Sequence, residues 1–255
     1  MRGYMRQGFA VVAAGALTVG TVILGAPGAS AANDQQRYRP DSGTQNSLKL
    51  PMKPNDRGTN VRLLHERLEW LGYNISSRDR VMRRLGSSTQ RAVRAAQDKF
   101  YLSENGRVDQ STWKTVQAAA GTVGALPRQC RAEAKVLCID KTAKVIRYVR
   151  NGKVAKTVDV RFGVPGLDTP TGTFRVWFRW ENATSGINGP DQPRAPMPYA
   201  LFFAGDIAVH YSPTFASTGY YPGGGSHGCV NVADLAAAQF LFREIPMGAL
   251  VHVYR

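Results

Sequence analysis

Residues 226–231 read Ser226-His227-Gly228-Cys229-Val230-Asn231, and a second histidine, His210, precedes them. A thiol is a weak nucleophile until it loses its proton, and a nearby imidazole can take that proton. Gly228 allows tight backbone geometry directly before Cys229, so that an incoming carbonyl can approach main-chain N–H donors. The stretch therefore contains the ingredients of a cysteine acyl-transfer enzyme.

His210 stands at the end of an apolar, strand-like run, residues 207–209. Strand ends that lead into loops often carry catalytic side chains. Residues 211–225 are rich in glycine, which lets the chain fold back and bring His210 to Cys229. A lone histidine after a strand is usually structural, but beside an unpaired cysteine we interpret His210 as its partner.

Residues 1–31 have the pattern of a secretory signal peptide, with a basic head and an uncharged apolar run at 9–24. Ala29-Ser30-Ala31 is a small-x-small cleavage site, so we expect cleavage after Ala31 and export. The alternative is an uncleaved membrane anchor, for which the apolar run is short. No later segment is long and apolar enough to span a membrane, so we expect no membrane span after the signal peptide is cleaved.

The chain is strongly basic, with a formal charge of +15. Removing Arg2 and Arg6 with the signal peptide lowers this charge to +13. Such a protein adheres to anionic polymers. Because an exported protein rarely meets nucleic acid, we expect anionic cell-wall polymers as partners and no nucleic acid.

Three cysteines are present, Cys130, Cys138 and Cys229. An odd count outside the cell leaves one thiol unpaired or pairs it between chains. Cys130 and Cys138 are close in sequence and could close a small disulfide loop, which would leave Cys229 free. The alternative is that Cys138 is a buried small hydrophobe and Cys130 an exposed thiol.

A polar linker is expected at residues 32–47, because this stretch has few apolar residues. A small three-helix domain is expected at 48–120. Its first helix has apolar residues at steps of three and four and ends at Gly72, and its third begins at Asp109. The second begins near Ser87 or Ser88, both good caps. The predicted inward residues are Val61, Leu64, Leu68, Leu71, Ala92, Val93, Ala96, Phe100, Trp113 and Val116.

The ordered signals of this segment resemble the peptidoglycan-binding domain type 1. They are Asp56-Arg57-Gly58, the apolar face of the first helix, Leu71-Gly72-Tyr73, Thr89 to Phe100, and Gly106-Arg107-Val108-Asp109 with Thr112-Trp113. The family usually has Gly-x-Phe-Gly before the second helix, where this chain has Arg83-Arg84-Leu85-Gly86. This turn is therefore the one place where the segment departs from the family pattern.

A hinge is expected at residues 121–128, followed by a second domain at 129–255. Short runs of β-formers predict strands at 136–140, 144–149, 154–160, 173–180, 199–203, 207–211 and 250–254, with a hairpin turn at Asn151-Gly152. A long loop at 182–198 is typical of a lid. One helix is expected at 233–243. We therefore predict an α+β protein whose second domain is a mostly-β sandwich with one packed helix.

His210, the spacer and the 226–231 stretch resemble the signature of the L,D-transpeptidase catalytic domain, the YkuD type. All of its fixed positions match, and the resemblance covers about residues 130–255. The stretches Arg161-Phe162-Gly163, Thr169-Pro170-Thr171-Gly172 and Met197-Pro198-Tyr199 also look like members of this family.

The resemblance implies a role for each site residue. Cys229 is the nucleophile and His210 is its general base, held by the backbone carbonyl of Tyr211. Backbone N–H groups at Gly228 and Cys229 form the oxyanion hole. The residues implied to shape the site or bind substrate are Ser226, His227, Asn231 and Tyr199.

The resemblance also implies the reaction and its partner, which is peptidoglycan, through both stem peptides and glycan. The thiolate attacks a tetrapeptide stem, D-alanine leaves, and a thioester remains. An amine of a neighbouring stem then attacks the thioester and gives a 3→3 cross-link. No cofactor is implied, and the enzyme is expected to be secreted and associated with the cell wall.

Four alternatives stay open at this level. Water as acceptor would make the chain an L,D-carboxypeptidase. A cell-wall cysteine endopeptidase generally places the cysteine before the histidine, which is not the order here. A zinc site from His210, His227 and Cys229 lacks a fourth ligand at familiar spacing, so we expect no metal. The remaining alternative is a non-catalytic cell-wall-binding protein.

Overall fold

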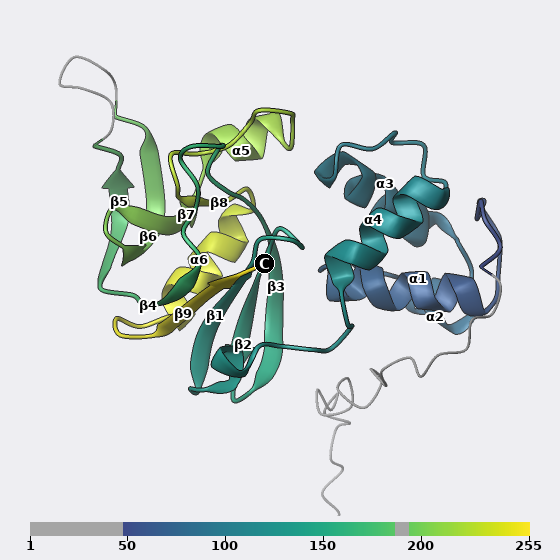
Figure 1. Ribbon diagram of the computed structural model, residues 1–255, viewed down its shortest axis with the longest axis horizontal. Coiled ribbons are helices and arrows are strands. Elements are labelled where there is room, and N and C mark those ends of the chain that lie inside the picture. The colour runs from purple at the N-terminus through teal and green to yellow at the C-terminus, as the bar shows by residue number, and fades with distance from the viewer. Residues whose placement is uncertain (1–47, 187–193) are drawn as a thin grey trace, which may run out of the picture. The chain divides into compact units, whose positions relative to one another are not determined.

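The computed structural model describes residues 48–186 and 194–255. The signal peptide expected at 1–31 and the linker expected at 32–47 lie outside the described residues. The first described part is helical, and the second is a sheet with two helices (Figure 1). The α+β class predicted from the sequence is therefore confirmed.

The helical part contains α1 (Thr59–Trp70), α2 (Ser77–Val81), α3 (Ser87–Lys99) and α4 (Gln110–Ala120). The sequence predicted α1, α3 and α4 but not the five-residue α2. The apolar faces predicted for the three longer helices are buried in one cluster, against which Phe100 packs partly exposed. Asp109, where the sequence predicted the start of the third helix, is the N-cap of α4, and its carboxylate accepts the Thr112 N–H at 2.7 Å.

The start of α3 differs from the prediction in its cap. Neither Ser87 nor Ser88 is the N-cap, because Ser87 is already the first helical residue. The N-cap is Gly86, which has no side chain to accept a hydrogen bond from the helix. The carboxylate of Asp79, only 4% exposed, takes this place by accepting Ser88 Oγ at 2.5 Å and Thr89 N–H at 3.1 Å. An anion at a helix N-terminus satisfies backbone donors and interacts favourably with the helix dipole.

The same carboxylate explains why the turn before α3 ends in glycine. A Cβ added to Gly86 would stand 2.0 Å from Asp79 Oδ1. Burial alone would raise the pKa of the Asp79 carboxyl, but the hydrogen bonds from Ser88 and Thr89 outweigh burial and leave its pKa below the ordinary value. The turn that departs from the peptidoglycan-binding family pattern is thus built around a buried charge.

The second part begins with a 3₁₀ helix, η3 (Arg128–Arg131), and contains nine strands in one sheet. The strand order is β4-β9-β1-β2-β3-β8-β7-β6-β5. Their bounds are β1 (Lys135–Asp140), β2 (Val145–Arg150), β3 (Lys153–Arg161), β4 (Gly172–Arg175), β5 (Phe178–Thr184), β6 (Pro196–Ala204), β7 (Ile207–Tyr211), β8 (Val230–Val232) and β9 (Leu250–Tyr254).

The helix predicted at 233–243 is α6 (Leu235–Glu244), which begins at the cap Asp234. Its buried residues share one hydrophobic cluster with side chains of β1, β2, β3, β6, β7, β8 and β9. Because strands from both ends of the order reach the same cluster, the sheet curls around α6 (Figure 1). One face of the curled sheet is therefore core, and the other is available for a site.

Three predicted segments have different bounds in the structure. The single strand expected at 173–180 is two strands, because β4 pairs with β9 and β5 pairs with β6. The loop expected at 182–198 is narrower, since both of its ends belong to the β5–β6 hairpin and 187–193 lie outside the described residues. The expected loop at 211–225 contains α5 (Pro213–Thr218), capped by Ser212.

Within the described ranges, no helix has the length and apolar character needed to cross a membrane.

Replacing Asp79 with asparagine tests the cap of α3. We expect Asp79→Asn to lower the free energy of unfolding of the helical part by about 2 kcal/mol at neutral pH, because a charge-assisted network is lost. Denaturant unfolding followed by helical circular dichroism measures this change. Since the folded pKa of Asp79 is lowered, the stabilisation is present above about pH 4 and is lost as pH falls through the folded value.

The matched control for this experiment is Glu104→Gln, which changes an exposed acid in the same part and should have little effect. Equal stability of Asp79→Asn and the unmodified protein at neutral pH would show that the carboxylate does not cap α3.

Candidate active site

The sheet brings Cys229 and His210 to one face. β7 and β8 are parallel neighbours, with His210 opposite Asn231 and Val209 opposite Val230. Residues that pair project from the same face, and successive residues alternate. Cys229, two residues before Asn231, therefore lies on the face of His210. Its buried neighbours confirm this, because Cys229 and Ala208 share a small cluster separate from the main core.

The imidazole of His210 is held in one tautomer. Its Nδ1 lies 2.6 Å from the backbone oxygen of Tyr211. A carbonyl oxygen can only accept, so Nδ1 carries the proton and Nε2 keeps a lone pair that can accept another. Burial lowers the pKa of His210 to about 4, although hydrogen bonds to Tyr211 and Asn231 act in the opposite direction. Near neutral pH the ring is therefore an uncharged base.

The thiol of Cys229 is free and only 8% exposed. Its Sγ lies 3.9 Å from the backbone oxygen of Asp206. Burial raises the pKa of the thiol; the Ala208 backbone opposes this rise and the Asp206 charge adds to it. Thiol and imidazole are therefore both neutral at rest, and attack on a carbonyl requires proton transfer between them.

Ser226 shapes the turn that carries the thiol. Its Oγ accepts the Gly228 N–H at 3.2 Å and donates to the Cys229 carbonyl oxygen at 2.6 Å. Gly228 has a φ of 112°, which side chains rarely adopt, and a Cβ there would stand 3.1 Å from Ile207 Cδ1. The Gly228 N–H, expected as an oxyanion donor, thus has a partner inside the motif. Of the two N–H groups expected to form the oxyanion hole, we therefore keep that of Cys229 as the candidate donor.

A segment between β3 and β4, residues 162–169 and here called the strap, runs behind this turn. The Ser226 N–H donates to the Phe162 oxygen and the Val164 N–H donates to the Ser226 oxygen, both at 3.0 Å. Gly163 comes so close that an added Cβ would stand 2.9 Å from the Gly228 backbone nitrogen and 1.9 Å from the Leu167 oxygen. The backbones of the strap and the turn are therefore in direct contact at Gly163, where any side chain would clash.

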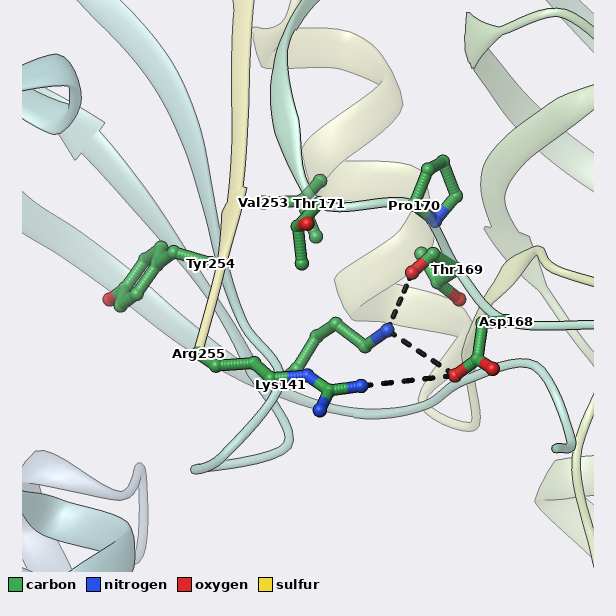
Figure 2. Close-up of a pocket in the computed structure, with 8 residues that line it drawn as sticks. All are labelled: Lys141, Asp168, Thr169, Pro170, Thr171, Val253, Tyr254 and Arg255. Atoms are coloured by element: carbon green, nitrogen blue, oxygen red, sulfur yellow. Dashed lines mark hydrogen bonds and ion pairs between the residues drawn. The ribbon is translucent and has the colours of Figure 1, made fainter.

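The far side of the strap opens into a shallow polar pocket. Figure 2 shows Lys141 reaching across it, with Nζ 2.5 Å from the Thr169 backbone oxygen and 3.7 Å from Asp168. Arg255 approaches the same carboxylate at 4.0 Å. Lys141 and Arg255 therefore both contact polar groups of the strap.

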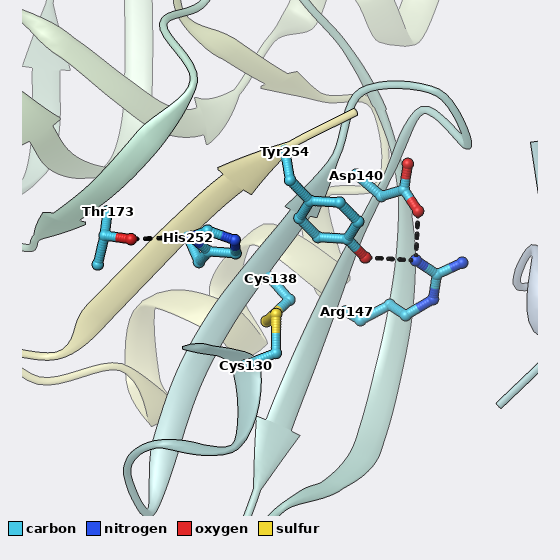
Figure 3. The surroundings of a disulfide bond; sticks show 7 residues. All are labelled: Cys130, Cys138, Asp140, Arg147, Thr173, His252 and Tyr254. Carbon is cyan, nitrogen blue, oxygen red and sulfur yellow. Dashed lines mark hydrogen bonds and ion pairs between the residues drawn. A yellow bond between two sulfur atoms is a disulfide. The ribbon is translucent and has the colours of Figure 1, made fainter. Parts of the chain in front are cut away.

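The other two cysteines form a disulfide, Cys130 with Cys138, between η3 and β1 (Figure 3). Cys229 is consequently the one free cysteine of the three in the chain. A reduced thiol at this position is a requirement of any nucleophilic role.

Two other predicted site residues are placed differently from the pair. His227 is exposed at the surface of the turn. Tyr199 packs its ring on Phe242 of α6, and its hydroxyl accepts Gln239 Nε2 at 2.9 Å. Because α6 covers the core face of the sheet, Tyr199 does not join Cys229 and His210. It lies on the same face as Leu201 and Phe203 of β6, which are buried in the main cluster.

Sequence reasoning missed the strap as a part of the site. The stretches containing Gly163 and Thr169 carried a resemblance but no assigned role. The available signal was a glycine and a Thr-Pro pair between two predicted strands, and only the fold shows that both contact the motif. Among the described residues, no group of three or more His, Cys, Asp or Glu side chains is arranged to hold a metal ion.

Two family models match the chain. Residues 134–253 match the L,D-transpeptidase catalytic domain family, and residues 57–116 match a peptidoglycan binding domain family. No curated protein matches the chain.

Two solved structures are similar over most of the chain. An L,D-transpeptidase from Stackebrandtia nassauensis is 21% identical with a TM-score of 0.51, over 81% of this chain and 98% of that one. Its likeness shows a shared fold. An L,D-transpeptidase from Xylanimonas cellulosilytica is 27% identical with a TM-score of 0.47, over 81% of this chain and 100% of that one.

The charge state of the pair predicts how Cys229 reacts with iodoacetamide. Only the thiolate reacts, and the thiol pKa is raised. We therefore expect the alkylation rate to rise about tenfold per pH unit between about pH 6 and pH 8. Labelling followed by mass spectrometry at a series of pH values measures the rate, and Cys229→Ala should take up no label.

A rate that stays constant across this range would contradict the neutral pair. It would mean that His210 is protonated and holds Cys229 as a thiolate.

Proposed function

We propose that this chain, whose residues 134–253 belong to the L,D-transpeptidase catalytic domain family, is a cysteine transpeptidase that makes 3→3 cross-links in peptidoglycan. The observation that carries the proposal is the placement of the free Cys229 thiol on the same sheet face as His210. The bond from Nδ1 of His210 to the Tyr211 carbonyl leaves Nε2 as the base.

The first step forms a thioester. Cys229 Sγ attacks the carbonyl carbon between the third residue of a tetrapeptide stem and its terminal D-alanine, while the thiol proton passes to His210 Nε2. The carbonyl oxygen becomes an oxyanion, which the Cys229 N–H stabilises. The carbon–nitrogen bond then breaks, His210 returns its proton to the leaving amine, and D-alanine departs.

The second step transfers the acyl group. A side-chain amine of a neighbouring stem attacks the thioester carbonyl, and His210 takes a proton from this amine. Collapse of the second oxyanion breaks the carbon–sulfur bond, and the sulfur recovers its proton. The products are a 3→3 cross-link and the regenerated Cys229 thiol.

The rest of the chain serves to hold the polymeric substrate. The peptidoglycan binding domain family matches residues 57–116, and the chain carries a formal charge of +15. Attachment to glycan or stem through this domain raises the concentration of the stem at Cys229. The positive charge favours anionic wall polymers. We place the mature protein outside the cell at the wall, on the signal-peptide pattern of residues 1–31.

Mass spectrometry of the mature protein with a tetrapeptide donor tests the proposal. We expect a mass gain equal to the tripeptide acyl group, with release of D-alanine, and no gain for Cys229→Ala. His210→Gln should slow acylation by about 100-fold or more, because the base is lost.

The matched control is His252→Gln, a histidine of the same sheet that is bonded to Thr173 (Figure 3) and lies on β9. It should acylate like the unmodified protein. Addition of a second stem distinguishes the acceptors, since a cross-linked product supports transpeptidation and free tripeptide alone would indicate an L,D-carboxypeptidase. An intact protein that takes up no acyl group would point to a non-catalytic wall-binding role.

A further inference from the structure

Thr169 is the strap residue that contacts the nucleophile turn through its side chain. It is 1% exposed and lies in the loop between β3 and β4. Its Oγ1 is 2.7 Å from the Gly228 backbone oxygen and 3.2 Å from the Gly163 backbone nitrogen. Both hydrogen bonds join neutral groups, so their effect is to fix the position of the Gly228 backbone.

The direction of both hydrogen bonds is fixed by chemistry. The Gly163 N–H can only donate, so the hydroxyl oxygen of Thr169 accepts it. The Gly228 carbonyl can only accept, so the single hydroxyl proton of Thr169 goes there. Thr169 therefore holds the Gly228 carbonyl on the strap side of the turn.

A trans peptide unit is planar, with its C=O and N–H pointing in opposite directions. The N–H that shares a peptide unit with the Gly228 carbonyl belongs to Cys229. Holding the carbonyl against the strap turns the Cys229 N–H away from the strap. The preceding N–H, that of Gly228, already donates to Ser226 Oγ.

We infer that Thr169 is a positioning residue for acyl transfer, which aims the Cys229 N–H at the oxygen of the carbonyl under attack. This inference rests on the function proposed above. The hydroxyl of Thr169 touches neither sulfur nor imidazole. Its effect passes through one rigid peptide unit, and it is greatest where negative charge develops on the substrate oxygen.

The backbone on either side of the hydroxyl supports this role. Lys141, whose side chain is 10% exposed, donates from Nζ to the Thr169 carbonyl oxygen at 2.5 Å (Figure 2). Pro170 follows, and a residue before proline is restricted to extended backbone. The main chain of Thr169 is therefore held independently of its hydroxyl, so removal of the hydroxyl should leave the strap in place.

Two reactions at Cys229 separate positioning from a merely structural role. Acylation by the tetrapeptide donor builds an oxyanion and needs the Cys229 N–H. Alkylation by iodoacetamide displaces iodide at a saturated carbon and builds no oxyanion. A loosened fold would alter both reactions, whereas a misaimed N–H alters acylation alone.

The experiment compares Thr169→Val, Thr169→Ser and Thr171→Val in the full mature chain. For Thr169→Val we expect acylation to slow by at least about tenfold, a smaller effect than complete loss of an oxyanion donor. Its alkylation rate should stay within about twofold of the unmodified protein. Thr169→Ser keeps the hydroxyl and should recover most of the acylation rate. Thr171→Val, the same change at an exposed position nearby, should alter neither reaction.

Thr169→Ala serves in the same comparison if valine prevents folding, because it brings no methyl group against the Gly228 carbonyl. Acylation at the normal rate in a folded variant without the hydroxyl would overturn the inference alone. A parallel fall of acylation and alkylation would also overturn it, in favour of a structural role. Failure of the unmodified protein to acylate would remove the proposed function and the inference with it.

Discussion

The parallel pairing of β7 with β8 is the constraint on which the site depends. It sets His210 opposite Asn231 and so places Cys229 on the face of the imidazole. A slip of one residue would turn Cys229 toward the core and expose the apolar residues that now pack on α6. Burial of Val209, Val230 and Val232 in the main cluster therefore fixes the register that places His210 and Cys229.

Much of this arrangement could be predicted from residues that carry local signals. The periodic faces of α1, α3 and α4, the Asp109 cap and the β7 strand follow from patterns within a few residues. The pairing of His210 with the 226–231 stretch could be predicted because together they resemble a long family signature. The turn before Cys229 could also be predicted, because glycine permits tight backbone geometry and serine can form hydrogen bonds with the backbone nearby.

The remaining features depend on contacts between segments far apart in the chain. β8 has only three residues, which is too short for a strand pattern to show in the sequence. It forms a strand because it pairs with β3 and β7 on either side. The cap of α3 comes from Asp79, on a helix too short to show periodicity. Tyr199 lies away from the site because it alternates in step with Leu201 and Phe203, which face the core, and its ring packs on Phe242 of α6. Likewise, Thr169 gains its role only through the Gly228 carbonyl, which lies 59 residues away in sequence.

Burial of Cys229 has a consequence for the lifetime of the protein in an oxidising medium. Peroxides and disulfides are attacked by a thiolate, and the path to sulfenic and sulfinic acids begins there. A buried sulfur that stays protonated offers such oxidants little to react with. The raised thiol pKa thus protects the unpaired cysteine as long as nothing takes its proton.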